Sequence, residues 1–305
     1  MALDAQGNVY ITGYSVNPDN YADVVTLKYS SQGKRLWVRR YNSPAKRWDQ
    51  GNAPAVDSQG YVYVIANSDI NDNFTNNPAF VTIKYSPSGD RLWVRFYDSP
   101  VNGNDHPVAL AIDPQDNVIV AGFSTGLSLS DNYLIMKYNS AGERLWLSRF
   151  TRRYATSNFR TVTVDQAGNI YVTPYSWGVD FATVKFNPDG KELWVARYNG
   201  PGNEDDIPAA IAVDGQGNVF VTGSSFTGLA TYRDYVTIKY DANGKRLWLR
   251  RANGPGNQSD YPQDMKLDQQ GNVYATGKFQ VSSFPQDYDY ATIKCDTFGN
   301  KVWLK

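Results

Sequence analysis

The chain has almost none of the side chains that most metal and nucleophile sites need. Its 305 residues include one histidine, His106, and one cysteine, Cys295. A single cysteine excludes an internal disulfide, and these two residues cannot assemble a zinc centre or a histidine-rich metal site within one chain. A Ser-His-Asp triad would have to use His106, which precedes a predicted strand and which we interpret as a surface residue. We therefore predict no catalytic residues of these kinds and no metal ligands.

The sequence also lacks an excess of charge and any long apolar run. Thirty basic residues balance 30 acidic residues, so the formal net charge is zero. Nucleic-acid binding favours a basic patch or stripe, and we expect no nucleic-acid partner. No apolar run approaches the roughly 18 residues that a membrane-spanning helix needs, so we expect no membrane insertion. Met1 leads directly into a predicted strand, and no signal peptide is expected in this chain.

Sustained helical spacing is missing as well, and the chain instead contains a repeat of about 50 residues. The motif Asp-x-x-Gly-Asn-Val-Tyr spans Asp4 to Tyr10, and related segments begin at Asp57, Asp113, Asp165, Asp214 and Asp268. A tryptophan marks a second landmark in every copy, at Trp37, Trp93, Trp146, Trp194, Trp248 and Trp303. The sequence therefore contains six tandem copies of one unit.

Each copy holds four short segments in which apolar and polar residues alternate, with many β-branched and aromatic residues. This pattern predicts strands rather than helices. In the fifth copy the segments are 209–213, 218–222, 235–240 and 245–250. Turns that begin at Asp214 and Asp241 join them in pairs, and Gly217 and Gly244 supply the positive φ that a tight turn needs. Four antiparallel strands in each of six copies predict an all-β fold, a six-bladed β-propeller.

We predict a single β-propeller domain over residues 1–305. Its blades are expected at approximately 1–41, 42–97, 98–150, 151–198, 199–251 and 252–305. The chain begins with the tail of a first strand and ends within a fourth strand, so it is cut at a connection between blades. Both a complete ring of six blades and a fragment of a longer ring stay open.

The repeat resembles a known family. The segments that carry the resemblance are Ala-Ile-Ala-Val-Asp at 210–214, Gly-Asn-Val-Phe-Val-Thr-Gly at 217–223, Tyr-Val-Thr-Ile-Lys-Tyr at 235–240 and Arg-Leu-Trp at 246–248. They look like the bacterial SBBP-type β-propeller repeat, and the resemblance covers essentially the whole chain. It implies seven blades, whereas six copies are present, and it implies an extracellular or cell-surface protein. It says little about activity, because one fold hosts many functions.

Several repeated polar residues have a structural interpretation. The six aspartates that begin the repeat motif are expected to hold tight turns rather than to form a ring of carboxylates. The third-strand lysines are expected to form ion pairs with nearby aspartates, and these pairs would contribute little to stability if exposed. The lysines are Lys28, Lys84, Lys137, Lys185, Lys239 and Lys294, and the aspartates are Asp23, Asp131, Asp180, Asp234 and Asp289. Cys295 replaces the Tyr or Phe of other copies and is expected to be buried.

No cofactor is predicted, with one alternative left open. The segment from Asp69 to Asn73 begins like a calcium-binding loop. Phe74, however, occupies the position where such a loop needs glycine, and no suitably spaced glutamate follows. Calcium therefore stays possible and unproven.

Function is expected where the copies differ. The connections between second and third strands and those between blades are long and variable, and they emerge on the same face of a propeller. Loops on a rigid scaffold commonly carry the binding residues. The aromatic residues that break the repeat in these connections are Trp48, Phe74, Tyr154, Trp177, Phe226, Tyr232, Phe279 and Phe284.

Three hypotheses follow. The first is a non-enzymatic recognition or scaffold propeller that binds a protein or glycan partner through this variable loop face. The second is a structural subunit that associates with copies of itself in a surface assembly or filament, since zero net charge gives little repulsion between copies. The third is a polysaccharide hydrolase or lyase that uses paired carboxylates from different loops.

Overall fold

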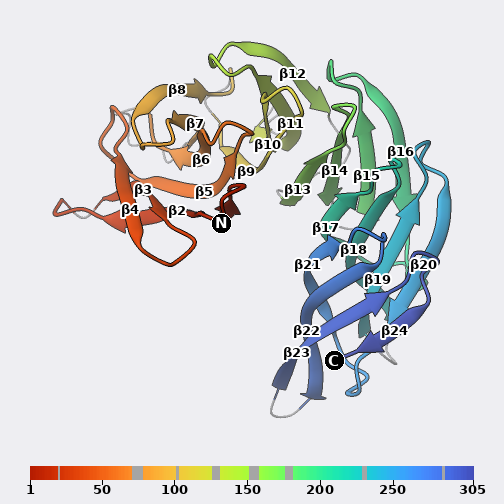
Figure 1. Cartoon of the computed structure of the whole chain (residues 1–305). Coiled ribbons are helices and arrows are strands. Elements are labelled where there is room, and N and C mark those ends of the chain that lie inside the picture. The colour runs from red at the N-terminus through yellow and green to blue at the C-terminus, as the bar shows by residue number, and fades with distance from the viewer. Residues whose placement is uncertain are drawn as a thin grey trace. The chain divides into compact units, whose positions relative to one another are not determined.

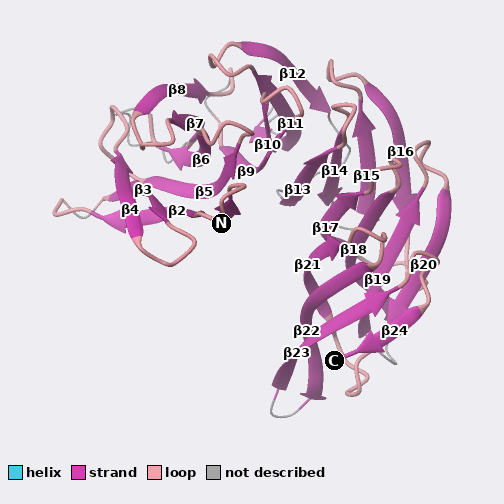
Figure 2. Cartoon of the chain, in the orientation of Figure 1, coloured by secondary structure: helices cyan, strands magenta, loops and turns pink. Residues whose placement is uncertain are grey.

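The computed structural model describes residues 1–19, 21–70, 78–100, 103–125, 131–150, 158–175, 181–228, 232–283 and 286–305. Every regular element in these ranges is a β-strand (Figure 2). The strands form six sheets of four, and each sheet joins its strands antiparallel in chain order. This arrangement confirms the predicted all-β fold of six four-stranded propeller blades. Within the part of the chain that is described, no helix is long and apolar enough to cross a membrane.

The chain divides into two compact units, the first covering Met1–Ala155 and the second Thr156–Lys305. The first unit contains blades 1 to 3, of which Figure 1 labels β2 to β12. Blade 1 consists of β1 (Ala2–Leu3), β2 (Val9–Val16), β3 (Ala22–Tyr29) and β4 (Arg35–Tyr41). Blade 2 consists of β5 (Asp49–Val56), β6 (Val62–Ser68), β7 (Ala79–Tyr85) and β8 (Arg91–Tyr97). Blade 3 consists of β9 (Asp105–Ile112), β10 (Val118–Thr125), β11 (Asp131–Tyr138) and β12 (Arg144–Phe150).

The second unit contains blades 4 to 6. Blade 4 consists of β13 (Asn158–Val164), β14 (Ile170–Tyr175), β15 (Phe181–Phe186) and β16 (Glu192–Tyr198). Blade 5 consists of β17 (Asp206–Val213), β18 (Val219–Gly228), β19 (Tyr232–Tyr240) and β20 (Arg246–Ala252). Blade 6 consists of β21 (Tyr261–Leu267), β22 (Val273–Ser283), β23 (Gln286–Cys295) and β24 (Lys301–Leu304).

The first turn of each blade is held by its aspartate. In blade 5 one carboxylate oxygen of Asp214 accepts hydrogen bonds from the backbone N–H groups of Gln216 at 3.0 Å and Asn218 at 2.8 Å. Gly217 supplies a φ of +79° in this turn. The aspartates of the other five blades accept the same pair of bonds. Local turn geometry therefore explains the repeated aspartate, as predicted.

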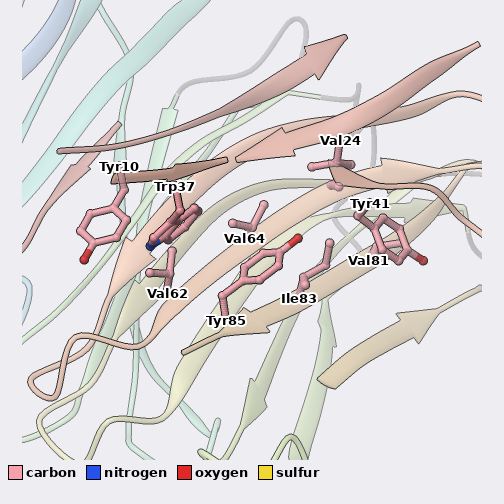
Figure 3. Close-up of a cluster of buried hydrophobic side chains, with 10 residues drawn as sticks. Tyr10, Val24, Trp37, Tyr41, Val62, Val64, Val81, Ile83 and Tyr85 are labelled. Atoms are coloured by element: carbon pink, nitrogen blue, oxygen red, sulfur yellow. The ribbon is translucent and has the colours of Figure 1, made fainter. Parts of the chain in front are cut away.

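The core lies between adjacent blades within each unit, and the repeated tryptophan is at its centre. The ring of Trp37 lies 6.1 Å from that of Tyr10 in its own blade and 6.2 Å from that of Tyr85 in blade 2 (Figure 3). Val62 and Val64 of β6 belong to the same buried cluster. The alternation of the sequence thus places one large aromatic side chain in the space between two sheets.

The third-strand lysines differ from the prediction. Lys28, Lys84, Lys137 and Lys185 are buried, and their partners are not the predicted ones. Lys84 donates to the Ser140 carbonyl of the next blade at 2.9 Å, and Lys137 forms an ion pair with Asp113 at 2.7 Å. The predicted partners Asp23 and Asp234 lie five residues before their lysines, and residues five apart in a strand point to opposite faces of the sheet. These four buried lysines therefore reach turns instead of third-strand aspartates. The predicted partner Asp180 lies outside the described residues.

One glycine position shows how closely the strands pack. A Cβ atom at Gly122 of β10 would overlap the His106 carbonyl oxygen and the Pro107 Cα of β9. Gly13 occupies the same repeat position in blade 1, where β1 contains only Ala2–Leu3, and a Cβ there would meet nothing within 4 Å.

We expect Gly122→Ala to lower the free energy of unfolding by about 2–4 kcal/mol, because the backbone of β9 must move to admit the methyl group. The matched change Gly13→Ala should leave stability within about 1 kcal/mol of the wild type. Urea denaturation followed by circular dichroism measures both values. Equal effects of the two substitutions would contradict the close approach of β9 and β10.

Candidate functional site

The connections between second and third strands and the connections between blades emerge at the same ends of the sheets. In blade 2, for example, the first residue of β5, Asp49, pairs with the last residue of β6, Ser68. The equivalent ends of blade 3 pair Asp105 with Ser124. We call these ends of the sheets the loop face, and the opposite ends, which carry the tight turns, the turn face.

The predicted aromatic binding residues have different environments on the loop face. Trp48 is 52% exposed and Tyr232 is 42% exposed. Phe226 is partly buried, and its carbonyl accepts a hydrogen bond from the Gly202 N–H, so it covers the preceding loop of its blade. The other predicted residues Phe74, Tyr154, Trp177 and Phe284 lie outside the described residues.

Phe279 is a core residue and not a surface residue. It is 3% exposed, and its ring meets that of Tyr235 edge-on at 4.6 Å. It also packs on Gly254, where an added Cβ would lie 2.9 Å from the ring. The sequence marked Phe279 because it breaks the repeat, but the residue breaks it to fill space beneath the connection that follows blade 5. We remove it from the candidate binding surface.

Four buried aspartates hold the connections between blades. Asp49, Asp105, Asp206 and Asp260 are fully buried at the start of a first strand or just before it. Each accepts a hydrogen bond from the backbone N–H six residues earlier, at 2.6, 2.5, 2.5 and 2.7 Å respectively. Burial raises the pKa of Asp49, Asp105 and Asp260 to about 6. These carboxylates therefore support the loop face from below and are not available to a ligand.

A polar groove opens on the loop face of the first unit, between blades 2 and 3. Its volume is about 400 Å³, and its lining includes Gln50 and Asn52 of β5, Asn67 of β6, His106 of β9 and Phe123 of β10. The Asn52 amide donates to the Pro107 carbonyl of the next blade at 2.5 Å and to the Asn67 side-chain oxygen at 3.2 Å. The rings of His106 and Phe123 lie 4.7 Å apart. Two neighbouring blades thus build one site.

The lining of this groove favours the binding of neutral polar groups. The amides of Gln50 and Asn67 can donate and accept hydrogen bonds, whereas Asn52 already uses both of its N–H groups and offers only its oxygen. The two rings offer flat apolar surfaces. Its described lining residues include no aspartate, glutamate or cysteine. Among the described residues no group of three His, Cys, Asp or Glu side chains is placed to hold a metal ion. Residues 71–73 of the segment that begins like a calcium loop lie outside the described ranges.

Sequence reasoning did not find this groove, because it considered only aromatic residues in the loops. The position after the buried aspartate is Gln50 in blade 2 and His106 in blade 3, but Ile207 and Tyr261 in blades 5 and 6. Asn52 likewise stands where blades 3 and 5 continue with small apolar residues. These polar residues, at first-strand positions that are apolar or aromatic in other blades, were the sequence signal that could have indicated the groove.

These observations define the class of the protein. Six four-stranded antiparallel sheets, each with one tryptophan in its fourth strand, make it a six-bladed β-propeller protein. Residues 193–225 match the family model of the SBBP beta-propeller repeat, which confirms the family that the repeat pattern resembled.

Comparisons with solved structures agree on the fold. A protein of unknown function from Dyadobacter fermentans superposes with a TM-score of 0.56 at 9% identity, covering 95% of this chain and 92% of that one. A catalytically inactive virginiamycin B lyase from Staphylococcus aureus, solved with quinupristin, gives 0.50 at 11% identity, covering 96% and 97%. The gluconolactonase XC5397 from Xanthomonas campestris gives 0.43 at 14% identity, covering 82% and 74%.

At these identities the likeness shows the fold alone, and the last TM-score carries no argument. The comparison with curated proteins found no match. The site must therefore be interpreted from its own residues.

The buried aspartates give a prediction for the dependence of stability on pH. Asp49 has an ordinary pKa of 3.8 and a pKa of about 6 in the folded chain, so the folded state binds more protons between these values. Its stabilising contribution is complete below about pH 4 and is lost as the pH rises through 6. Asp49→Asn removes this titration while keeping a side-chain oxygen that accepts the Ser43 N–H.

Relative to the wild type, Asp49→Asn should therefore be more stable at pH 7.5 than at pH 4.5, by about 1–2 kcal/mol. Urea denaturation of both proteins at the two pH values measures the difference. The exposed Asp90→Asn is the matched control, and it should lack this trend. A difference between wild type and Asp49→Asn that is the same at both pH values would contradict the burial of an ionisable Asp49.

Proposed function

We propose that this chain is a non-enzymatic recognition module that binds a glycan through the groove between blades 2 and 3. The observation that carries the proposal is the lining of the groove, in which three amide side chains, one imidazole and one phenyl ring face the same space. Sugar hydroxyls both donate and accept hydrogen bonds, and an amide side chain has an oxygen that accepts and an NH₂ group that donates. Apolar C–H faces of a sugar ring pack well on flat aromatic surfaces such as Phe123.

The size of the groove supports a glycan rather than a folded protein as the partner. A stable protein interface buries about 800 Å² on each partner and has a large apolar centre. The groove of about 400 Å³ has the dimensions of a site for one or two sugar rings. Trp48 immediately precedes β5, two residues before Gln50, and is half exposed. We expect the chain to bind a protein partner through the glycans that the partner carries.

The other two hypotheses have less support at this site. A hydrolase that uses paired carboxylates needs two of them about 5–10 Å apart in an open cleft, and the part of the groove lining that the structure describes contains none. Self-association has no comparable feature among the described residues. A glycan-binding role also fits the extracellular or cell-surface location that the repeat family implies, and both stay proposals.

The test uses the full chain on an array of neutral oligosaccharides, followed by titration calorimetry with the best ligand. We expect Gln50→Ala combined with His106→Ala to weaken that binding at least about tenfold, because one hydrogen-bonding group and one ring surface are lost. Neither side chain is fully buried, so the fold should tolerate the change.

Tyr290→Ala is the control, since Tyr290 is 95% exposed in another blade and should leave the affinity unchanged. Failure of the wild type to bind any glycan on the array would refute the proposal, and so would equal binding by the double variant.

A further inference from the structure

A second groove lies on the turn face of the other unit, between blades 5 and 6. Its volume is about 1300 Å³, and Asp214, Lys239, Trp248, Arg250 and Phe298 contribute to its lining. These residues come from β19, β20 and two tight turns, and Asp268 of a third turn also lines the groove. The groove is therefore separate in sequence, blade and face from the site described above.

In four blades a tyrosine joins the turn aspartate to the third-strand lysine. The hydroxyls of Tyr10, Tyr63, Tyr171 and Tyr274 donate to the aspartate of the same blade at 2.9, 3.2, 2.8 and 3.2 Å. In each of these blades the lysine ammonium lies 4.9 to 5.2 Å from the centre of the tyrosine ring. The phenol therefore sits beside both charged groups.

Blade 3 has no tyrosine hydroxyl between its aspartate and its lysine. Ile119 occupies the tyrosine position, and Lys137 contacts the Asp113 carboxylate directly at 2.7 Å. The two charges neutralise each other in the absence of a phenol.

Blade 5 has neither arrangement. Phe220 occupies the tyrosine position, and the Lys239 ammonium lies 4.9 Å from the centre of its ring. Within the described residues Lys239 has no ion pair or hydrogen bond, and Asp214 receives hydrogen bonds only from its own turn. A carboxylate and an ammonium that line the same groove thus lack the hydroxyl that accompanies them in four other blades.

The space is also open at the turn itself. In blade 2 the turn residue Ser58 donates to Asp116 of blade 3 through its N–H at 2.9 Å and its hydroxyl at 2.7 Å, which closes the gap between the two turns. Gly215 occupies this turn position in blade 5, and a Cβ atom there would meet nothing within 4 Å. Two departures from the repeat, Phe220 and Gly215, therefore coincide at one groove.

We propose that this groove binds a neutral sugar, one hydroxyl of which takes the place of the missing phenol. The hydroxyl donates its hydrogen to Asp214 and accepts a hydrogen bond from the Lys239 ammonium. The Phe298 ring, 74% exposed at the rim, offers a flat surface for the C–H face of the sugar.

Charge favours a neutral ligand over an anion. The two cations Lys239 and Arg250 face two carboxylates, Asp214 and Asp268, so the lining has no net charge. The Arg250 guanidinium already donates to the carbonyls of Leu249 and Phe298. An anionic group would meet two carboxylates, whereas a hydroxyl can satisfy a carboxylate and an ammonium together.

The decisive variant restores the residue of the other blades. Phe220→Tyr puts a hydroxyl between Asp214 and Lys239, as in blades 1, 2, 4 and 6, so it should fold and should raise the melting temperature slightly. The probe is a panel of glucose, galactose, mannose, N-acetylglucosamine, maltose and cellobiose, measured on the full chain by saturation-transfer-difference NMR and calorimetry.

We expect at least one of these sugars to bind the wild type and Phe220→Tyr to weaken its binding at least about tenfold. Lys239→Met should also weaken it, whereas the matched change Lys294→Met in blade 6 should not. Gln50→Ala with His106→Ala should leave this binding intact, which separates it from the loop-face site. A wild type that binds none of the sugars, or a Phe220→Tyr variant that binds as tightly as the wild type, would overturn the proposal.

Discussion

The structure depends on one contact between adjacent blades, in which the indole N–H of one blade meets the last turn of the next. Trp37 donates to the Pro87 carbonyl at 3.1 Å, Trp93 to Ser140 at 3.1 Å, Trp194 to Ala242 at 3.0 Å and Trp248 to Thr297 at 3.1 Å. In three of these pairs the third-strand lysine donates to the same carbonyl. One turn carbonyl therefore fixes the position of a blade against its neighbour within each unit.

This contact explains why so many side chains repeat. The carbonyl must lie in one place, so its turn needs an αL glycine such as Gly89, with a φ of +89°. The glycine also lets the Trp37 ring approach, because a Cβ there would lie 3.0 Å from the indole. The flat indole and the flexible lysine both donate to this carbonyl, as Trp37 and Lys28 do to that of Pro87. The repeated residues serve the joining of blades, which leaves the remaining positions free to vary.

The fold was predictable from the sequence because its signals are local and occur six times. Turn aspartates, αL glycines and alternating strands each act within one hairpin, so one copy suffices to interpret the others. Lys28, Lys84 and Lys185 were interpreted wrongly because their carbonyl partners lie in the next blade, 56 to 59 residues away, and no local pattern reports that distance. The prediction that Phe279 belongs to the binding surface was wrong for a related reason. Only the packing of the folded chain shows that its ring lies under the connection between blades 5 and 6.

The candidate sites were less predictable, because each is built from two blades. The loop-face groove joins Asn52 to a carbonyl 55 residues later. The turn-face groove depends on two missing side-chain groups, the tyrosine hydroxyl that Phe220 lacks and the serine side chain that Gly215 lacks. Their importance follows from the contacts that the tyrosines and Ser58 make in other blades, which the sequence does not show. In both places a departure from the repeat coincides with an open, polar space, and we infer that binding evolved where the joining of blades left residues free.

The most direct test of this account is a backbone amide NMR titration of the full chain with neutral oligosaccharides. We expect chemical shift changes to gather at residues 50–52, His106 and Val108 on the loop face and at 214–216 on the turn face. Changes at the shared turns alone, such as 4–8 and 165–169, or no changes at any residue, would contradict the claim that the departures from the repeat carry the function.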